Sequence, residues 1–67
     1  ENVRIMQNYL NAIGRIYTGI PTLVADGIYG NATANAVRTF QRLFGLTVDG
    51  IIGRITWNRI VTVYNSL

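Results

Sequence analysis

Apolar residues recur at helical spacing near the start of the chain. The first stripe consists of Ile5, Met6, Tyr9, Leu10 and Ile13. Spacings of three and four residues place such side chains on one face of a helix, so the pattern predicts a helix over residues 3–13. We expect Gly14 to end this helix in the left-handed conformation that glycine adopts at helix C-termini. The alternative is a helix that continues to Tyr17, at a cost of about 1 kcal/mol for an internal glycine.

Residues 15–25 predict a connecting loop, because Gly19, Ile20 and Pro21 interrupt helical structure. This loop is unusually apolar for a connection between helices. We therefore expect some of its side chains to pack onto the helices. Its large apolar residues are Ile16, Tyr17, Ile20, Leu23 and Val24.

An eight-residue motif then occurs twice. Residues 26–33 (DGIYGNAT) and residues 49–56 (DGIIGRIT) both match D-G-I-x-G-x-x-T, with an offset of 23 residues. Such a repeat indicates a duplicated supersecondary unit, and each copy is followed by an apolar pattern of helical period. The apolar positions are Ala36, Val37, Phe40, Leu43 and Phe44 after the first copy, and Trp57, Ile60, Val61, Tyr64 and Leu67 after the second. We expect Gly45 to close the middle helix.

Each position of the motif has a physical interpretation. The Asp carboxylate can accept backbone N–H bonds, and the first Gly allows positive φ in the turn. The Ile is expected to be an apolar anchor buried between helices. The second Gly is expected to be the N-cap of the following helix, with the Thr hydroxyl reaching back toward the cap. Together with the first helix, these units predict an all-α, compact three-helix bundle that forms a single domain over residues 1–67.

Composition excludes several classes of enzyme. The chain lacks Cys and His, its six basic residues are all Arg, and its acids are Glu1, Asp26 and Asp49. The two internal acids occupy equivalent turns, so no pair is left for acid–base cleavage of a glycosidic bond. We therefore expect no catalytic residue, no metal site and no cofactor. No apolar run approaches the ~18 residues of a membrane span. Because the chain begins with Glu1 rather than Met, we expect a fragment of a longer protein.

These motifs occur together in a known family. The sequence resembles the peptidoglycan-binding domain of the PGBD-like fold at Gln7, Leu10, Asn11 and Gly14, at both D-G-x-x-G-x-x-T motifs, at Phe40-Gln41, at residues 45–53 and at Thr56-Trp57. The resemblance covers roughly residues 3–64. It implies a three-helix, non-catalytic module attached to cell-wall hydrolases such as amidases, muramidases and spore-cortex-lytic enzymes. The partners so implied are peptidoglycan and an attached catalytic domain, in the cell wall or spore cortex outside the cell; we expect a monomer.

The sequence departs from the family pattern in two places. The family usually has Pro after the second Gly of each motif, whereas this chain has Asn31 and Arg54. Pro at the first helical position is pre-organised, so some local rigidity is lost, and two hydrogen-bonding side chains stand beside helix N-termini instead. The loop at residues 18–25 is also longer than usual.

Polar helix faces and aromatic residues supply the candidate site. A stripe on the middle helix carries two guanidinium groups, which suit the carboxylates of peptidoglycan stem peptides, although a solvated face explains it equally well. Tyr29 could stack on a sugar ring. Trp57 is expected to be mostly buried against the second motif, the alternative being an indole that lines a groove. Gln41 is expected to bond a loop backbone. The predicted ligand-binding residues are Tyr29, Asn31, Asn35, Arg38, Arg42, Arg54, Trp57 and Asn58.

Two other functions are found among small three-helix domains: DNA binding and protein–protein interaction. A helix-turn-helix DNA-binding domain is disfavoured, because the net charge is only +3, the Arg residues are spread over all three helices, and the turns are longer than the 3–4 residues of that motif. We therefore expect no nucleic-acid partner. A protein–protein interaction module, or one that docks onto the parent enzyme, remains the alternative.

Overall fold

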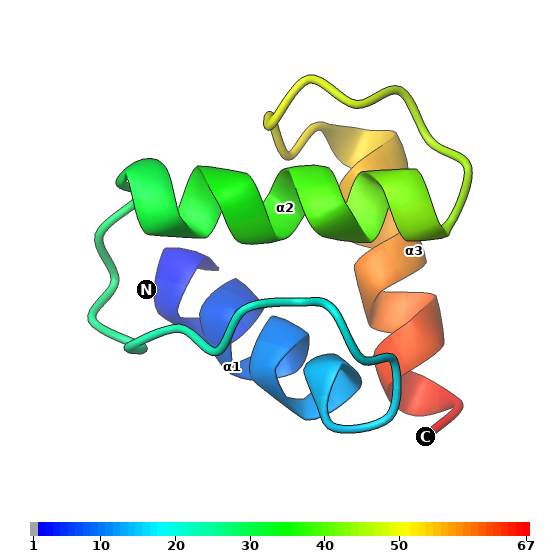
Figure 1. The fold of residues 1–67 in the computed structure, drawn as a ribbon, viewed down its shortest axis with the longest axis horizontal. Coiled ribbons are helices and arrows are strands. Elements are labelled where there is room, and N and C mark those ends of the chain that lie inside the picture. Colours follow the sequence, from blue (N-terminus) through cyan, green and yellow to red (C-terminus); the bar gives the residue numbers. More distant parts are fainter. Residues whose placement is uncertain (1) are drawn as a thin grey trace.

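Three helices connected by two irregular loops make up the fold (Figure 1). The computed structural model describes residues 2–67, in which α1 spans Asn2–Gly14, α2 spans Asn31–Leu43 and α3 spans Arg54–Asn65. α1 packs against both other helices, and α3 stands steeply across one end of α2 (Figure 1). The described part of the chain contains no strand, which confirms the prediction of an all-α three-helix bundle.

The core consists of one face from each helix and two side chains from the first loop. Ile20 and Leu23 are the buried loop residues, which confirms that the apolar loop packs onto the helices, while Ile16 and Val24 stay exposed. The buried apolar residues are Met6, Leu10, Ile13, Ile20, Leu23, Ala36, Val37, Phe40, Ile60 and Val63. Within residues 2–67, no helix has the length and apolarity needed to cross a membrane.

The first helix ends at Gly14 as predicted, but the expected reason is wrong. Gly14 does not adopt positive φ. Instead, a Cβ at this position would lie 3.3 Å from the carbonyl oxygen of Ile20 and 3.5 Å from its Cβ. The residue is small because the returning loop passes close to it. Asn11 holds the same loop in place, since its amide donates to the Leu23 carbonyl at 2.8 Å and accepts from the Leu23 N–H at 2.7 Å.

The other helix ends that the sequence predicts at glycine residues lie where they were predicted. Gly30 and Gly53 are the N-caps of α2 and α3, both with extended backbone. At the end of α2, the Gly45 N–H bonds the Arg42 carbonyl and the Leu46 N–H bonds the Gln41 carbonyl. This pair of bonds is the Schellman motif, which satisfies carbonyls at the helix end.

A buried glutamine holds the first repeated turn. Gln7 is 1% exposed, and its Nε2 donates to Asp26 Oδ1 at 3.2 Å, to the Ile28 carbonyl at 3.0 Å and to Thr33 Oγ1 at 3.0 Å. Its Oε1 accepts from the Gly27 N–H at 2.9 Å. The Gln7 side chain thereby connects α1 both to the first repeated motif and to the N-terminal turn of α2.

Gln41 repeats this arrangement in the second unit. Its Nε2 donates to Asp49 Oδ1, the Ile51 carbonyl and Thr56 Oγ1 at 2.9, 3.1 and 3.2 Å, and its Oε1 accepts from the N–H groups of Asp49 and Gly50. We call these two sets the glutamine networks. The glutamine and its aspartate are 19 residues apart in the first network and 8 in the second, so the same set of bonds forms across connections of different length.

The isoleucine of each motif does not have the predicted position. Ile28 and Ile51 are 66% and 65% exposed, so neither is an anchor buried between helices. The glutamine amide bonds the carbonyl of this residue, and the apolar side chain lies outside the core. The motif threonines are buried and accept a bond from the glutamine. The Thr33 hydroxyl also contacts the Ile28 carbonyl at 3.4 Å, and neither N-cap receives a side-chain hydrogen bond.

Candidate binding groove

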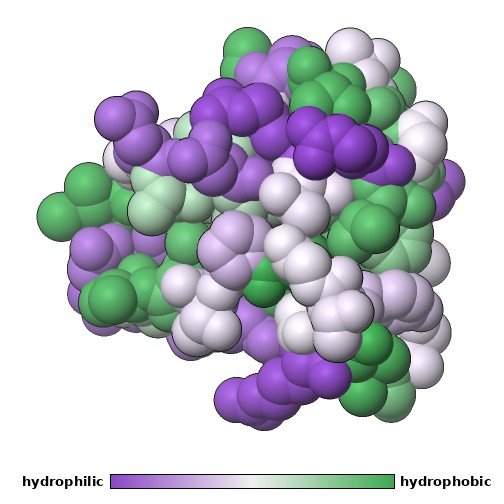
Figure 2. Space-filling model, in the orientation of Figure 1, coloured by the Kyte–Doolittle hydropathy of each residue, from purple (hydrophilic) through white to green (hydrophobic). Residues whose placement is uncertain are grey.

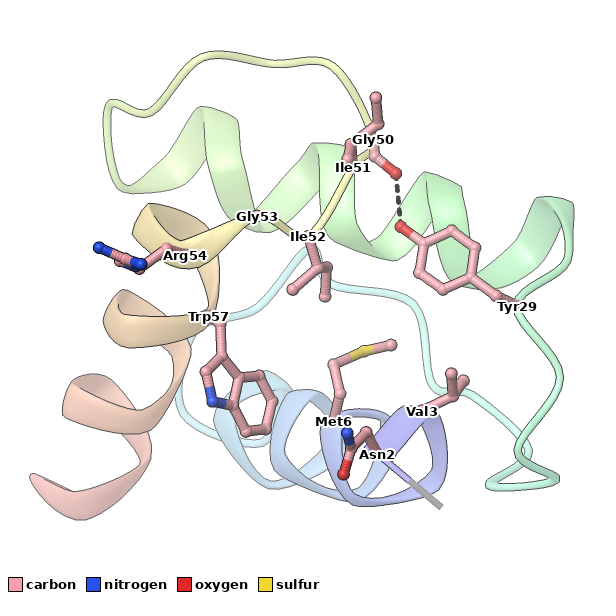
Figure 3. Close-up of a pocket in the computed structure, with 10 residues that line it drawn as sticks. All are labelled: Asn2, Val3, Met6, Tyr29, Gly50, Ile51, Ile52, Gly53, Arg54 and Trp57. Atoms are coloured by element: carbon pink, nitrogen blue, oxygen red, sulfur yellow. Dashed lines mark hydrogen bonds between the residues drawn. The ribbon is translucent and has the colours of Figure 1, made fainter.

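A groove of about 640 Å³ lies between the start of α1, the second repeated turn and the start of α3 (Figure 3). The α1 side chains come from its first two turns, and the opposite wall comes from the second motif. One residue of the first motif, Tyr29, closes the remaining side. The groove is lined by Asn2, Val3, Met6, Tyr29, Gly50, Ile51, Ile52, Gly53, Arg54 and Trp57.

The floor of the groove is apolar. Met6, Ile52 and Trp57 point toward one another from three different segments (Figure 3). The Tyr9 ring stacks parallel to the Trp57 indole at a centroid distance of 6.0 Å, and the Tyr64 ring stacks on Tyr9 at 3.9 Å. Trp57 is therefore half-buried in an aromatic row and also lines the groove, which agrees with the alternative prediction for this residue.

Tyr29 connects the two repeated turns. Its hydroxyl donates a hydrogen bond to the Gly50 carbonyl, and its ring lines the groove while the residue remains 40% exposed. Burial raises the pKa of the Tyr29 hydroxyl, so the donor form is kept throughout the neutral range. Because its proton is engaged with Gly50, the hydroxyl can only accept a further hydrogen bond, and the ring forms part of the groove's surface.

Arg54 carries the only formal charge among the residues that line the groove. It is exposed, and among the described residues its guanidinium has no hydrogen-bond or ion-pair partner. Figure 3 shows the side chain extending outward from the groove's edge beside Gly53. A second hollow of about 750 Å³ lies next to the groove and shares Ile51, Gly53 and Arg54 with it. Arg54 thus stands where the two hollows meet.

The other predicted residues do not line this groove. Arg38 donates to Asn35 Oδ1 along α2, and its guanidinium packs close to Gly50, so it supports the second turn. Asn31, Arg42 and Asn58 are exposed on helix surfaces elsewhere. The structure therefore brings together three of the eight predicted residues: Tyr29, Arg54 and Trp57.

Sequence reasoning missed the contribution of α1. Asn2, Val3 and Met6 form one wall of the groove, whereas the periodicity placed Met6 only in a core stripe. Comparison of the motif copies contained a usable signal. Ile52 and Trp57 in the second copy correspond to Tyr29 and Ala34 in the first, so only the second copy places an indole beside the turn.

The two internal acids, Asp26 and Asp49, accept backbone hydrogen bonds within the repeated turns. Asp26 accepts the Ile28 N–H at 2.9 Å and Asp49 accepts the Ile51 N–H at 2.9 Å. These backbone bonds, followed by the bonds from Gln7 and Gln41, lower the pKa of both carboxyl groups. Gln41 bonds the loop backbone as predicted. Residues 2–67 contain no group of three His, Cys, Asp or Glu side chains placed to hold a metal ion.

The face seen in Figure 2 carries polar side chains over α2 and several separate apolar patches. The exposed apolar residues include Ile16, Val24, Ile28, Ile51 and Ile55. No single broad apolar surface dominates this face. The groove, with its apolar floor and single cation, is the feature with the chemistry of a ligand site.

Comparison with known proteins assigns the family. Residues 1–60 match the family model described as "Putative peptidoglycan binding domain", and the chain belongs to this family. The predicted resemblance is confirmed. No solved structure matches the chain significantly.

Curated relatives are enzymes of the bacterial cell wall and spore cortex. The chain is 50% identical over 38 residues to a zinc D-Ala-D-Ala carboxypeptidase of Streptomyces albus G, covering 57% of this chain and 15% of that protein. It is 50% identical over 38 residues to the N-acetylmuramoyl-L-alanine amidase CwlL of Bacillus licheniformis, covering 57% and 11%. It is 44% identical over 45 residues to a spore cortex-lytic enzyme of Bacillus cereus, covering 67% and 17%. The matches thus span a small part of each enzyme.

Proposed function

We propose that this domain is a non-catalytic module that binds peptidoglycan in the α1–α3 groove and brings an attached cell-wall hydrolase to its substrate. The observation that carries the proposal is the groove itself, in which an apolar floor and the guanidinium of Arg54 occur together in a member of this family. The relatives that share the domain are much longer enzymes, which supports a targeting role outside the cell, in the wall or spore cortex.

The hydrogen bonding of the two internal acids supports a role without catalysis. Asp26 and Asp49 each bond their own turn and a buried glutamine. Each lowered carboxyl pKa keeps the group ionised at neutral pH, whereas a general acid needs a raised one. The domain is proposed to work as a monomer within its parent chain.

Co-sedimentation with purified sacculi tests the proposal. The isolated domain should sediment with sacculi without reducing their turbidity. Tyr29→Ala should weaken sedimentation, because the ring lines the groove. Tyr17→Ala is the matched control, since Tyr17 is also 40% exposed but lies outside the groove. Circular dichroism checks that both variants fold. A wild-type domain that stays in the supernatant contradicts binding, and a fall in turbidity contradicts the absence of catalysis.

Docking onto a protein surface is the second candidate function. It is favoured by Ile51 and Ile55, which are 65% and 73% exposed beside the second hollow. Retention of the domain on the parent's purified catalytic domain, together with no sedimentation on sacculi, would favour docking over wall binding. Loss of that retention in Ile55→Asn would locate the docking surface.

A further inference from the structure

We infer that the groove binds the stem peptide of peptidoglycan, with short aliphatic side chains on its floor and a carboxylate at Arg54, and that it does not bind the glycan strand. This inference rests on the proposed function. Peptidoglycan offers two chemistries: sugars, which are rich in hydroxyl groups, and short peptides, which carry methyl groups and carboxylates. The groove distinguishes between them by its polarity, its aromatic geometry and its charge.

The polarity of the floor favours the peptide. Met6, Ile52 and Val3 present only apolar atoms or a thioether to a ligand. A sugar buried there would lose hydration of its hydroxyl groups without finding partners, which costs free energy. The Tyr29 hydroxyl already donates to the Gly50 carbonyl and can only accept a further bond. The Asn2 amide is the one other uncharged polar side chain of the lining, so few partners are available for several sugar hydroxyl groups. An alanine methyl group, in contrast, gains by leaving water for such a surface.

The aromatic geometry points the same way. A sugar ring stacks on an open aromatic face. The Trp57 indole instead lies parallel to the Tyr9 ring, with an interplanar angle of 4°, and Tyr64 continues the stack behind Tyr9. Trp57 is half-buried by these contacts. Because Tyr9 partly covers one face of the indole, the surface that Trp57 offers in the groove is a limited apolar area, which suits a methyl group.

The charge identifies the polar end of the ligand. Arg54 is the sole formal charge of the lining and is unpartnered among the described residues. A guanidinium binds a carboxylate with two parallel hydrogen bonds. The side chain starts beside Gly53 and is directed away from the apolar floor (Figure 3), so it would meet a carboxylate at the end of a peptide that leaves the floor at this edge. Glycan hydroxyl groups carry no charge to complement it.

The first motif lacks this combination of residues. An offset of 23 residues places Asn31 opposite Arg54 and Ala34 opposite Trp57. The cation and the apolar wall thus occur together only in the second copy. The duplicated fold consequently carries one peptide site rather than two.

The test compares sedimentation with intact sacculi and binding to the soluble glycan strands that an N-acetylmuramoyl-L-alanine amidase releases when it removes the stem peptides. The lactyl carboxyl groups that this cleavage frees are amidated, so that they do not mimic a stem-peptide carboxylate. The domain should sediment with intact sacculi and should not bind the soluble strands. Arg54→Gln should weaken this binding about tenfold, the effect of losing a charged hydrogen bond at an exposed position. Arg15→Gln makes the same charge change at an exposed loop residue and should bind as wild type. Circular dichroism verifies folding of both variants.

A titration followed by Trp57 fluorescence adds a direct measurement. The soluble stem peptide should bind, and the same peptide with its carboxyl groups amidated should bind about tenfold more weakly. Equal binding of the soluble glycan strands and of the stem peptide, or equal loss of binding in Arg54→Gln and Arg15→Gln, overturns the peptide assignment while leaving peptidoglycan binding intact. Failure to sediment with intact sacculi refutes the proposed function itself.

Discussion

The glutamine networks make a prediction about stability that is independent of any ligand. Replacing Gln41 by Leu keeps the size of a buried side chain but removes every polar atom of the second network. Gln41 makes five hydrogen bonds, at 2.9–3.2 Å, to the turn and to α3. The change would leave two backbone N–H groups, a carbonyl, a carboxylate and a hydroxyl without this partner.

The magnitude follows from how many of those groups water can reach. A buried polar group without a partner costs about 1–3 kcal/mol. Asp49 and Ile51 are exposed and can turn to solvent, whereas Gly50 and Thr56 are buried. Counting only these two groups, Gln41→Leu should cost roughly 2–6 kcal/mol. This is a large share of the ~3–10 kcal/mol expected for a domain of this size, and it should lower the melting temperature by about 8 °C or more.

Urea unfolding followed by circular dichroism and by the fluorescence of Trp57 measures this change. Gln7→Leu should give a similar loss, because Gln7 makes the equivalent bonds. Gln41→Glu should also be destabilised at neutral pH, since its carboxylate would face Asp49 and the Ile51 carbonyl. That defect should diminish as acid protonates the new side chain and restores a donor. A loss below about 1 kcal/mol in Gln41→Leu would refute a stabilising role for the network.

Two further predictions concern the repeated turns. Gly27 and Gly50 have φ of +78° and +71°, so alanine at either costs about 1–2 kcal/mol. At Gly50 the new Cβ would also lie 2.6 Å from Arg38 Nη1. That atom is the end of a flexible side chain and can move aside, so the two variants should lose similar stability; a much larger fall in melting temperature for Gly50→Ala would contradict this. The lowered pKa of Asp26 and Asp49 means that their contribution to stability is complete above the unfolded value of 3.8 and is lost as pH falls through the lower folded value. The Asp26→Asn, Asp49→Asn double variant should therefore show a smaller fall in melting temperature below about pH 4 than the wild type, and parallel curves would count against the proposed linkage.

Some residues that line the groove could be predicted from the local sequence pattern, and others line it only because of how the helices pack. Tyr29, Arg54 and Trp57 could be chosen from the sequence because they differ between the two motif copies or stand at a helix start. Arg38 and Arg42 could not be rejected in this way. Periodicity places them on the polar face of α2, but only the folded chain shows that this face does not line the groove, and that Arg38 instead bonds Asn35 and covers the second turn.

The sequence by itself determined the three helices, the glycine boundaries at Gly30, Gly45 and Gly53, and the duplicated turns, because these depend on periodicity and on backbone preferences over a few residues. Tertiary structure decided how the turns are held and where a ligand can bind. Gln7 reaches an aspartate 19 residues away. Its separate bond to the Ile28 carbonyl directs that carbonyl inward while the Ile28 side chain stays exposed. The groove joins α1 to the second turn across more than 40 residues of chain. Such contacts depend on how the helices pack, which no local pattern encodes.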